Sequence, residues 1–92
     1  MQLEFDEAKN TRNIRFRGIS LDRFAEMDPA TTVVSEDARI DYGERRLRLF
    51  GHIDARLHVA VITYRHERTR VISLGRANRR EQQKYAKATR TT

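Results

Sequence analysis

The most apolar stretch of the chain, LHVAVITY at residues 57–64, limits what this sequence can fold into. It is too short to cross a membrane and is rich in β-branched side chains, so it predicts a buried central strand. Elsewhere apolar residues are scarce, because Phe, Leu, Ile and Val number 21 of 92. That proportion lies just above the range typical of disordered chains, and we therefore expect one small domain over residues 1–92 with a thin core.

The N-terminal segment predicts a short strand followed by a helix. Residues 2–5 alternate polar and apolar side chains, as a strand does. Asp6 is a suitable N-cap for a helix that runs to about Phe16, and Gly18 supplies a left-handed end.

A second helix and four further strands are expected after Gly18. Ser20 can cap the helix, which Asp28-Pro29 ends because the residue before proline avoids helical angles. Asp54-Ala55 is suited to a hairpin turn, and residues 37–43 favour a loop. The strands are expected over residues 31–35, 46–53, 57–64 and 70–74.

The last part of the chain predicts a basic helix over about residues 77–90. Asn78 and Glu81 form a variant of the capping box that opens it. Its apolar side is small, so we expect weak docking, either as a partly disordered tail or as a helix that shifts when a partner binds. The resulting order, β-α-α-β-β-β-β-α, describes an α+β domain with a small antiparallel sheet, and we place the helices on one face.

Positive charge is concentrated near the C-terminus. Residues 65–92 carry nine basic and two acidic side chains, whereas residues 1–64 have a net charge of −1. A polyanion is the natural partner for such a segment, and the preference for Arg over Lys favours phosphate, which the guanidinium fork can bind bidentately. The alternative is a solvated basic tail that keeps the protein in solution.

Three groups of side chains are candidates for phosphate chemistry. Lys9, Asn13 and Arg17 recur every four residues along one side of the first helix, although an ordinary solvated helix face has the same pattern. Arg65 and Arg70 cluster with Ser73 around the last two strands, where two guanidinium groups can stabilise a pentacoordinate phosphate. The third group is a stripe on the final helix, formed by Arg76, Arg80, Lys84 and Lys87.

The histidines differ in what they can do. His66 lies beside Glu67 in an Arg-rich turn, and these two residues are the candidates for proton transfer near a phosphate. His58, inside the central strand, is better explained as a half-buried structural residue, and His52 as a surface residue near a hairpin. No pair of histidines has a metal-ligand spacing with a supporting carboxylate, so we predict no metal and no other cofactor.

The sequence also predicts where the protein works. There is no Cys, which fits a reducing cytosol. The N-terminus lacks the pattern of a signal peptide, and no apolar run is long enough for a membrane span. We therefore expect a cytoplasmic protein without membrane contact.

Several short motifs resemble the BrnT-like toxins. The similarity spans nearly the whole chain in the order and spacing of that family. It rests on Phe5-Asp6-x-x-Lys9-x-x-x-Asn13, Gly18-Ile19-Ser20, Thr63-x-Arg65, Arg70-Val71-Ile72-Ser73, and Ala77 with Arg80-Glu81. The chain departs from the family at Phe16-Arg17, where Lys-His is usual, and at Gly75, where a basic residue is usual.

The resemblance implies a ribonuclease toxin of a type II toxin–antitoxin system with a RelE/ParE-like fold. Such a toxin cleaves RNA and inhibits translation and growth. A BrnA-like antitoxin would neutralise it in a hetero-oligomer, and the ribbon-helix-helix domain of that antitoxin would make the only contact with DNA.

On this interpretation we expect a metal-independent endoribonuclease in which the ribose 2′-OH attacks the adjacent phosphate. Arg65, Arg70 and Arg76 would stabilise the phosphorane, with Glu67 or His66 as general acid or base. The remaining candidates would hold the RNA backbone: Lys9, Asn13, Arg17, Ser73, Arg80 and Lys84.

Two alternatives remain open. Arg17 cannot replace a proton-transferring histidine, because guanidinium stays charged at any working pH. The chain could therefore be a catalytically silent homologue that binds nucleic acid or the antitoxin. It could also be a gyrase-directed toxin of the same fold.

Overall fold

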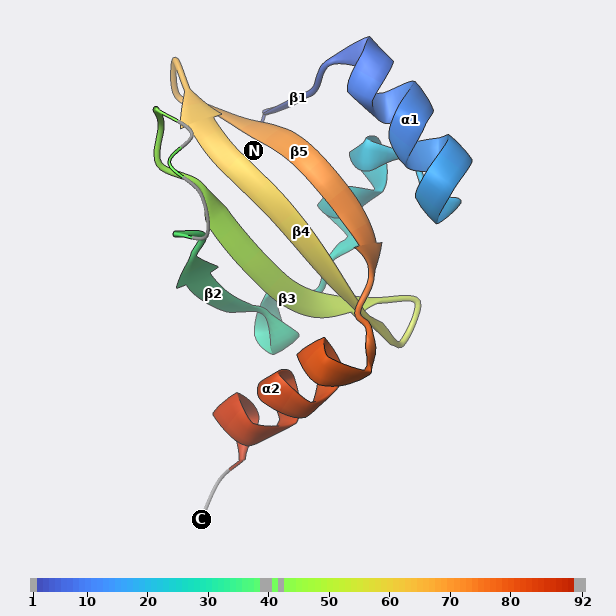
Figure 1. Cartoon of the computed structure of the whole chain (residues 1–92), viewed down its shortest axis with the longest axis vertical. Helices are drawn as coiled ribbons and strands as arrows, with labels where there is room; N and C mark the ends of the chain where they lie inside the picture. Colours follow the sequence, from blue (N-terminus) through green and yellow to red (C-terminus); the bar gives the residue numbers. More distant parts are fainter. Residues whose placement is uncertain (1, 39–40, 42, 91–92) are drawn as a thin grey trace.

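Five strands form a single mixed sheet in the order β1-β5-β4-β3-β2 (Figure 1). The computed structural model describes residues 2–38, 41 and 43–90, so three positions of the expected loop, 39, 40 and 42, lie outside it. The apolar stretch lies in the central strand β4, as predicted. The strands are β1 (Leu3–Glu4), β2 (Val33–Glu36), β3 (Leu47–Ile53), β4 (Arg56–Arg65) and β5 (Arg68–Arg76).

The expectation of a purely antiparallel sheet is wrong at one edge. Strands β2 to β5 pair antiparallel as a meander, but β1 pairs parallel to β5, with Leu3 opposite Thr69 and Glu4 opposite Arg70. No hairpin joins β1 to its neighbour, so no tight turn dictates its direction. Two hairpin turns do link β3 to β4 and β4 to β5, and the turn predicted at Asp54-Ala55 is confirmed by positive φ angles of 51° and 62°.

The core lies between one face of the sheet and the segment that follows the first helix. Leu21, Phe24 and Met27 from this segment are buried against sheet residues such as Ile62 and Leu74. The segment forms two 3-10 helices, η1 (Leu21–Glu26) and η2 (Pro29–Thr31), so the expected second α-helix is wrong. The three buried residues recur every three positions, which matches the three residues per turn of a 3-10 helix.

The first helix, α1 (Glu7–Arg17), is confirmed together with both of its ends. The Asp6 carboxylate accepts hydrogen bonds from the backbone N–H groups of Ala8 and Lys9, and Gly18 has φ 72°. In Figure 1, α1 lies beside β5 at the sheet edge that also carries β1. Because β1 pairs only with the start of β5, α1 meets the remaining length of that edge.

The last helix, α2 (Arg79–Thr89), packs on the opposite face from the core. Arg48 forms an ion pair with Glu81 at 2.7 Å, and the His52 ring meets Tyr85 edge-on at 5.7 Å between centroids. Arg48 and His52 alternate along β3 with the core residues Leu49 and Ile53, so they point away from the core. The expectation that all helices share one face is therefore wrong.

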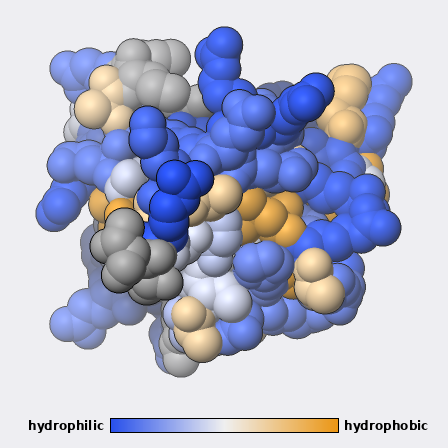
Figure 2. Space-filling model, turned by 90° about the horizontal axis from the view of Figure 1, so that it is seen from below, coloured by the Kyte–Doolittle hydropathy of each residue, from blue (hydrophilic) through white to orange (hydrophobic). Residues whose placement is uncertain are grey.

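The capping box predicted for α2 is present, with Asn78 and Glu81 each bonded to the other's backbone N–H. No residue of α2 is buried. Figure 2 shows this end of the molecule as mainly hydrophilic, with small separate hydrophobic patches. Among the described residues, no helix is long and apolar enough to span a membrane.

Candidate phosphate-binding groove

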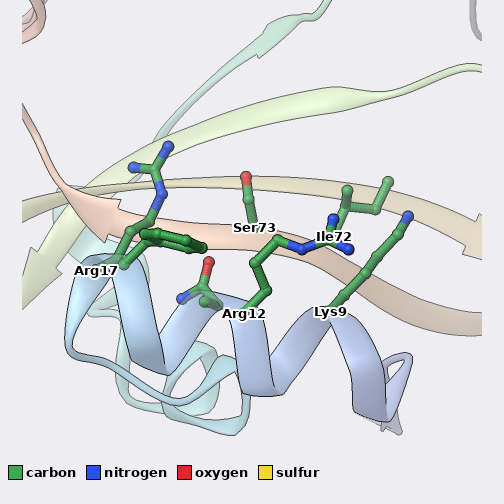
Figure 3. A pocket seen from close by; sticks show the side chains of 7 residues that line it. Lys9, Arg12, Arg17, Ile72 and Ser73 are labelled. Carbon is green, nitrogen blue, oxygen red and sulfur yellow. The ribbon is translucent and has the colours of Figure 1, made fainter.

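A groove of about 310 Å³ runs between α1 and β5. Lys9, Arg12 and Arg17 rise from the helix toward Ile72 and Ser73 of the strand (Figure 3). Phe16 and Asn13 complete the lining. The groove is thus walled by three cations and a hydroxyl group, and none of its lining residues is acidic.

Asn13 fixes the helix to the strand and is one of the residues that line the groove. Its Nδ2 donates to the carbonyls of Leu74 and Ile19 at 2.7 and 2.9 Å, and the Leu74 N–H donates to its Oδ1 at 3.2 Å. One side-chain amide therefore satisfies both backbone groups of Leu74, as a neighbouring strand would. Both N–H groups of the amide are used inside the protein, so Asn13 holds α1 against β5.

The three cations of the groove, Lys9, Arg12 and Arg17, form no ion pair with any carboxylate that the structure describes. Arg17 reaches across Gly75, so closely that a Cβ on Gly75 would lie 2.5 Å from Arg17 Nη1. Gly75 thus leaves the space that the Arg17 guanidinium fills.

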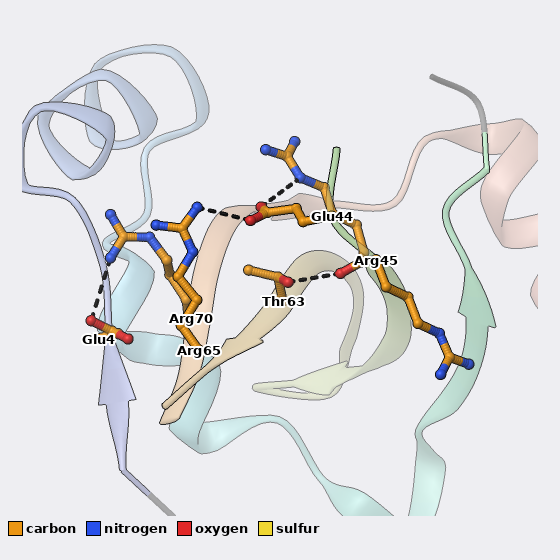
Figure 4. Close-up of polar contacts among 7 residues, drawn as sticks. Glu4, Glu44, Arg45, Thr63, Arg65 and Arg70 are labelled. Atoms are coloured by element: carbon orange, nitrogen blue, oxygen red, sulfur yellow. Dashed lines mark hydrogen bonds and ion pairs between the residues drawn. The ribbon is translucent and has the colours of Figure 1, made fainter. Parts of the chain in front are cut away.

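Arg65 and Arg70 occupy the other half of the same sheet face. In the register of β4 and β5, Arg65 pairs with Arg68 and Thr63 with Arg70, which makes Arg65 and Arg70 diagonal neighbours. Each is held by a carboxylate, Arg65 by Glu44 at 2.8 Å and Arg70 by Glu4 at 3.3 Å (Figure 4). Their charges are therefore partly neutralised within the protein.

The ion pair with Arg65 perturbs both of its partners. A hydrogen bond from the Arg65 guanidinium lowers the pKa of Glu44, and the same bond raises the pKa of Arg65. Arg46 also reaches Glu44 at 3.4 Å. Glu44 belongs to the segment before β3, which no sequence pattern had linked to the arginines.

The two candidates for proton transfer lie at the tip of the β4–β5 hairpin. His66 and Glu67 have φ angles of 51° and 65° and are exposed. Glu67 is six residues from Ser73, roughly 20 Å along the strand at the usual rise per residue. The structure places these two beside Arg65 and Arg70 but apart from the groove.

The remaining candidates are dispersed. Arg76 lies at the end of β5 and lines a separate cavity with Arg17 and His58. Arg80 is exposed on α2, and Lys84 lies beside Phe50 and Tyr85. The fold therefore brings together Lys9, Arg17 and Ser73, but not the three sequence-predicted groups as one site.

The burial of His58 and His52 tests the sequence-based expectation for each. His58 is buried, with 6% of its surface exposed, and its Nδ1 lies 2.8 Å from the Arg56 carbonyl oxygen. His52 is half-buried against Tyr85, so its expected surface position is wrong. In the part of the chain that the structure describes, no three His, Asp or Glu side chains are grouped as a metal site would require.

Arg12 and Phe16 are functional candidates that sequence reasoning missed. Arg12 follows Lys9 by three residues, a spacing that places both on one side of a helix. Phe16 is 73% exposed and lines the groove together with these cations. A phenylalanine flanked by two arginines within the predicted helix was the signal available in the sequence.

A small α+β domain with a groove walled by unpaired cations is suited to binding the phosphates of a nucleic acid. A family model described as "Ribonuclease toxin, BrnT, of type II toxin-antitoxin system" matches residues 5–81, which include the whole groove. The chain belongs to this family of toxins. A search of curated proteins found no match.

Proposed function

We propose that this protein is an endoribonuclease that binds RNA in the groove between α1 and β5 and cleaves it without a metal ion. One observation carries the proposal: Lys9, Arg12 and Arg17, which form no ion pair with a carboxylate of the described residues, line the same groove as Ser73, and the lining contains no acid. Such a set of positive charges is suited to the extra negative charge that a phosphate gains in the transition state.

In the proposed reaction the ribose 2′-OH attacks the adjacent phosphorus while the bond to the 5′-oxygen breaks. The products are a 2′,3′-cyclic phosphate and a 5′-hydroxyl end, with no external nucleophile consumed. Arg12 and Arg17 neutralise the phosphorane, and the Ser73 hydroxyl donates to a non-bridging oxygen. Lys9 donates a proton to the leaving 5′-oxygen, since a guanidinium cannot give one up, and the 2′-OH proton passes to water.

Phe16 supplies a surface for a nucleobase. Its exposed ring lies at the groove, and Arg15 lies over it with 5.6 Å between the guanidinium carbon and the ring centroid. Bases stack on such rings with little regard to sequence. The proposal therefore predicts single-stranded RNA as the preferred substrate.

The roles of Arg65 and Arg70 are then secondary. A phosphate held by them would have to share their guanidinium groups with the carboxylates of Glu44 and Glu4. We assign them to the RNA backbone beside the groove, and the chemical step to the groove cations. His66 and Glu67 are not needed for proton transfer in this scheme.

The cellular role follows from the family. We infer that the chain arrests translation and growth in the cytoplasm. We also infer that a BrnA-like antitoxin with a ribbon-helix-helix domain binds it in a hetero-oligomer, and that the chain itself makes no contact with DNA. We also propose that the α+β fold of this chain is of the RelE/ParE-like type.

The test is growth and total RNA after induced expression of the chain and three variants. We expect arrest and fragmented RNA for the wild type, and loss of both for Lys9→Gln/Arg12→Gln. Arg65→Ala/Arg70→Ala should weaken arrest less. Arg90→Gln, which removes an exposed cation at the C-cap of α2 outside the matched region, should behave as the wild type.

Purified protein completes the test. Cleavage should continue in excess EDTA and leave cyclic phosphate ends. Loss of cleavage in EDTA with recovery in Mg²⁺ would overturn the metal-independent mechanism. Full toxicity of Lys9→Gln/Arg12→Gln would overturn the groove as the site.

A second candidate function rests on one observation, that the groove lining contains no histidine and no carboxylate. A homologue that binds RNA or the antitoxin without cutting would have such a site. Normal growth and intact RNA with soluble wild-type protein would support this function. A DNA-damage response without RNA fragments would instead indicate a gyrase-directed toxin.

A further inference from the structure

A second basic cavity, of about 580 Å³, lies past the C-terminal end of α1. It is formed where the end of α1, the β3–β4 hairpin and the end of β5 meet. Four arginines line it, and Asp54 is the one acidic residue among the residues that line it. The full lining is Arg17, Gly18, Ile19, Arg23, Ile53, Asp54, Arg56, His58 and Arg76.

The charges of this cavity are largely uncompensated. Asp54 is engaged by Arg23 at 2.6 Å, and Arg23 also binds Glu26 at 2.8 Å. No carboxylate pairs with Arg56 or Arg76 in the described residues. The cavity therefore has an excess of positive charge and attracts an anion.

Backbone pairing directs three polar side chains to one side of the sheet. His58 is the register partner of Arg76 across β4 and β5, and Arg56 precedes His58 by two residues. Residues paired in this way, or two apart, share a face. His58 Nδ1 must carry the hydrogen in its 2.8 Å bond, because the Arg56 carbonyl can only accept, and this bond fixes the ring in the wall of the cavity.

Arg17 joins this cavity to the groove, since it lines both. Its guanidinium crosses β5 at Gly75, where any Cβ would lie within 3 Å of the Arg17 side chain. A basic path thus runs from Lys9 and Arg12, over Gly75, to Arg56 and Arg76. A nucleic acid strand carries phosphates at regular intervals and can follow such a path.

We propose that the cavity is a second phosphate-binding site, which takes a phosphate group next to the one held in the groove. Arg56 and Arg76 bind its oxygens, and the His58 ring lines the wall of the site. The proposal rests on the proposed function in the groove. The phosphate comes either from within the RNA strand or from its 5′ end, and the chemistry of recognition is the same.

The test measures binding of 2′-O-methyl tetranucleotides, which cannot be cleaved, to the full chain over a range of salt concentrations. For Arg56→Gln/Arg76→Gln we expect weaker binding and a plot of log K against log salt that is flatter by about 0.7, the value for one phosphate contact on a single strand. Arg68→Gln, a matched change at the other end of β5, should leave the slope unchanged. If the plot for Arg56→Gln/Arg76→Gln has the same slope as the plot for Arg68→Gln, the proposal is overturned.

Two further arms separate the outcomes. If Lys9→Gln/Arg12→Gln flattens the plot of log K against log salt and Arg56→Gln/Arg76→Gln does not, RNA binds in the groove and the second site is ruled out. If only Arg56→Gln/Arg76→Gln flattens the plot, the second cavity binds a phosphate and the groove does not. Ligands with and without a 5′ phosphate show the source: an effect confined to the phosphorylated strand marks a terminal phosphate, and an equal effect on both marks an internal one.

Discussion

Gly75 and Arg17 form a pair whose members are distant in sequence and complementary in size. The strand offers an open position at Gly75, and the guanidinium from α1 fills it. Positive charge beside Ser73 is therefore supplied by the helix. An arginine at position 17 that lies across β5 in this way needs a small residue at position 75.

We predict that Gly75→Ala lowers RNA affinity but leaves the free energy of unfolding nearly unchanged. The new Cβ would displace only the flexible end of Arg17, so the free energy of unfolding should change by less than about 1 kcal/mol. RNA affinity should fall about tenfold, because Arg17 loses its place beside the phosphate. Urea unfolding and fluorescence anisotropy measure the two effects.

A double-mutant cycle sharpens this prediction. Arg17→Ala should weaken binding as Gly75→Ala does, and the two changes together should weaken it no further. Additive losses would show that Gly75 acts on RNA by some route other than Arg17.

The Glu44–Arg65 ion pair predicts a pH dependence. The hydrogen bond from Arg65 lowers the pKa of Glu44, so Glu44 stays ionised in the folded chain after glutamates of the unfolded chain begin to protonate. Its stabilising contribution is present above the ordinary glutamate pKa, near 4.3, and is lost as pH falls through the lower folded value. In an NMR titration the Glu44 midpoint should rise in Arg65→Gln and stay unchanged in Arg68→Gln.

At the scale of elements, alternation and end signals decide which segments could be assigned from sequence. The strands are marked by alternating or β-branched residues, and α1 by its cap at Asp6 and its end at Gly18, so their predictions are confirmed. The segment after Gly18 has a period of three that was assigned to an α-helix. The burial of Leu21, Phe24 and Met27 by the sheet selects the 3-10 form.

The hairpin between β4 and β5 carries strain that a glycine can relieve. His66 and Glu67 both adopt positive φ, a conformation that side chains disfavour. We predict that Glu67→Gly raises the free energy of unfolding by about 0.5–1 kcal/mol and leaves RNA cleavage unchanged. Thermal denaturation and a cleavage assay test both parts.

The other hairpin provides the matched control for this prediction. Ala55 also has a positive φ, of 62°, in the turn between β3 and β4, so Ala55→Gly should stabilise to a similar extent. Loss of cleavage in Glu67→Gly but not in Ala55→Gly would return Glu67 to the role of general acid or base.

For the whole molecule, charge governs association. The chain has a net charge of +6, and the groove and the second cavity concentrate unpaired cations on its surface. We predict that the antitoxin presents an acidic surface and that its association rate falls steeply as salt rises. Stopped-flow mixing at low and high salt measures this rate, and a rate that does not respond to salt would contradict the electrostatic account.

The count of basic residues along the sequence did not predict where unpaired positive charge lies on the folded surface. The excess of basic residues lies after position 64, yet two of the arginines there, Arg65 and Arg70, are held by acids from elsewhere. The groove cations come from α1, which lies within residues 1–64, whose net charge is −1. A folded surface depends on which charges remain unpaired, and a count of residues does not contain that information.

The sequence alone determined the features that depend on neighbours a few residues apart. The caps of α1, the capping box of α2, the alternation in β3 and the turn at Asp54-Ala55 all belong to this kind. Their physics is local, because hydrogen bonds and side-chain periodicity within one element fix them.

Only the tertiary structure decided which residues distant in sequence contact one another. Asn13 bonds to Leu74 across 61 positions, and Arg70 meets Glu4 across 66. Contacts between distant residues also decide three further features: the sheet face on which α2 packs, the parallel direction of β1, and the position of Arg17 at Gly75. Packing brings these groups together, and no local pattern records it, so the candidate site became visible only when α1 was placed against β5.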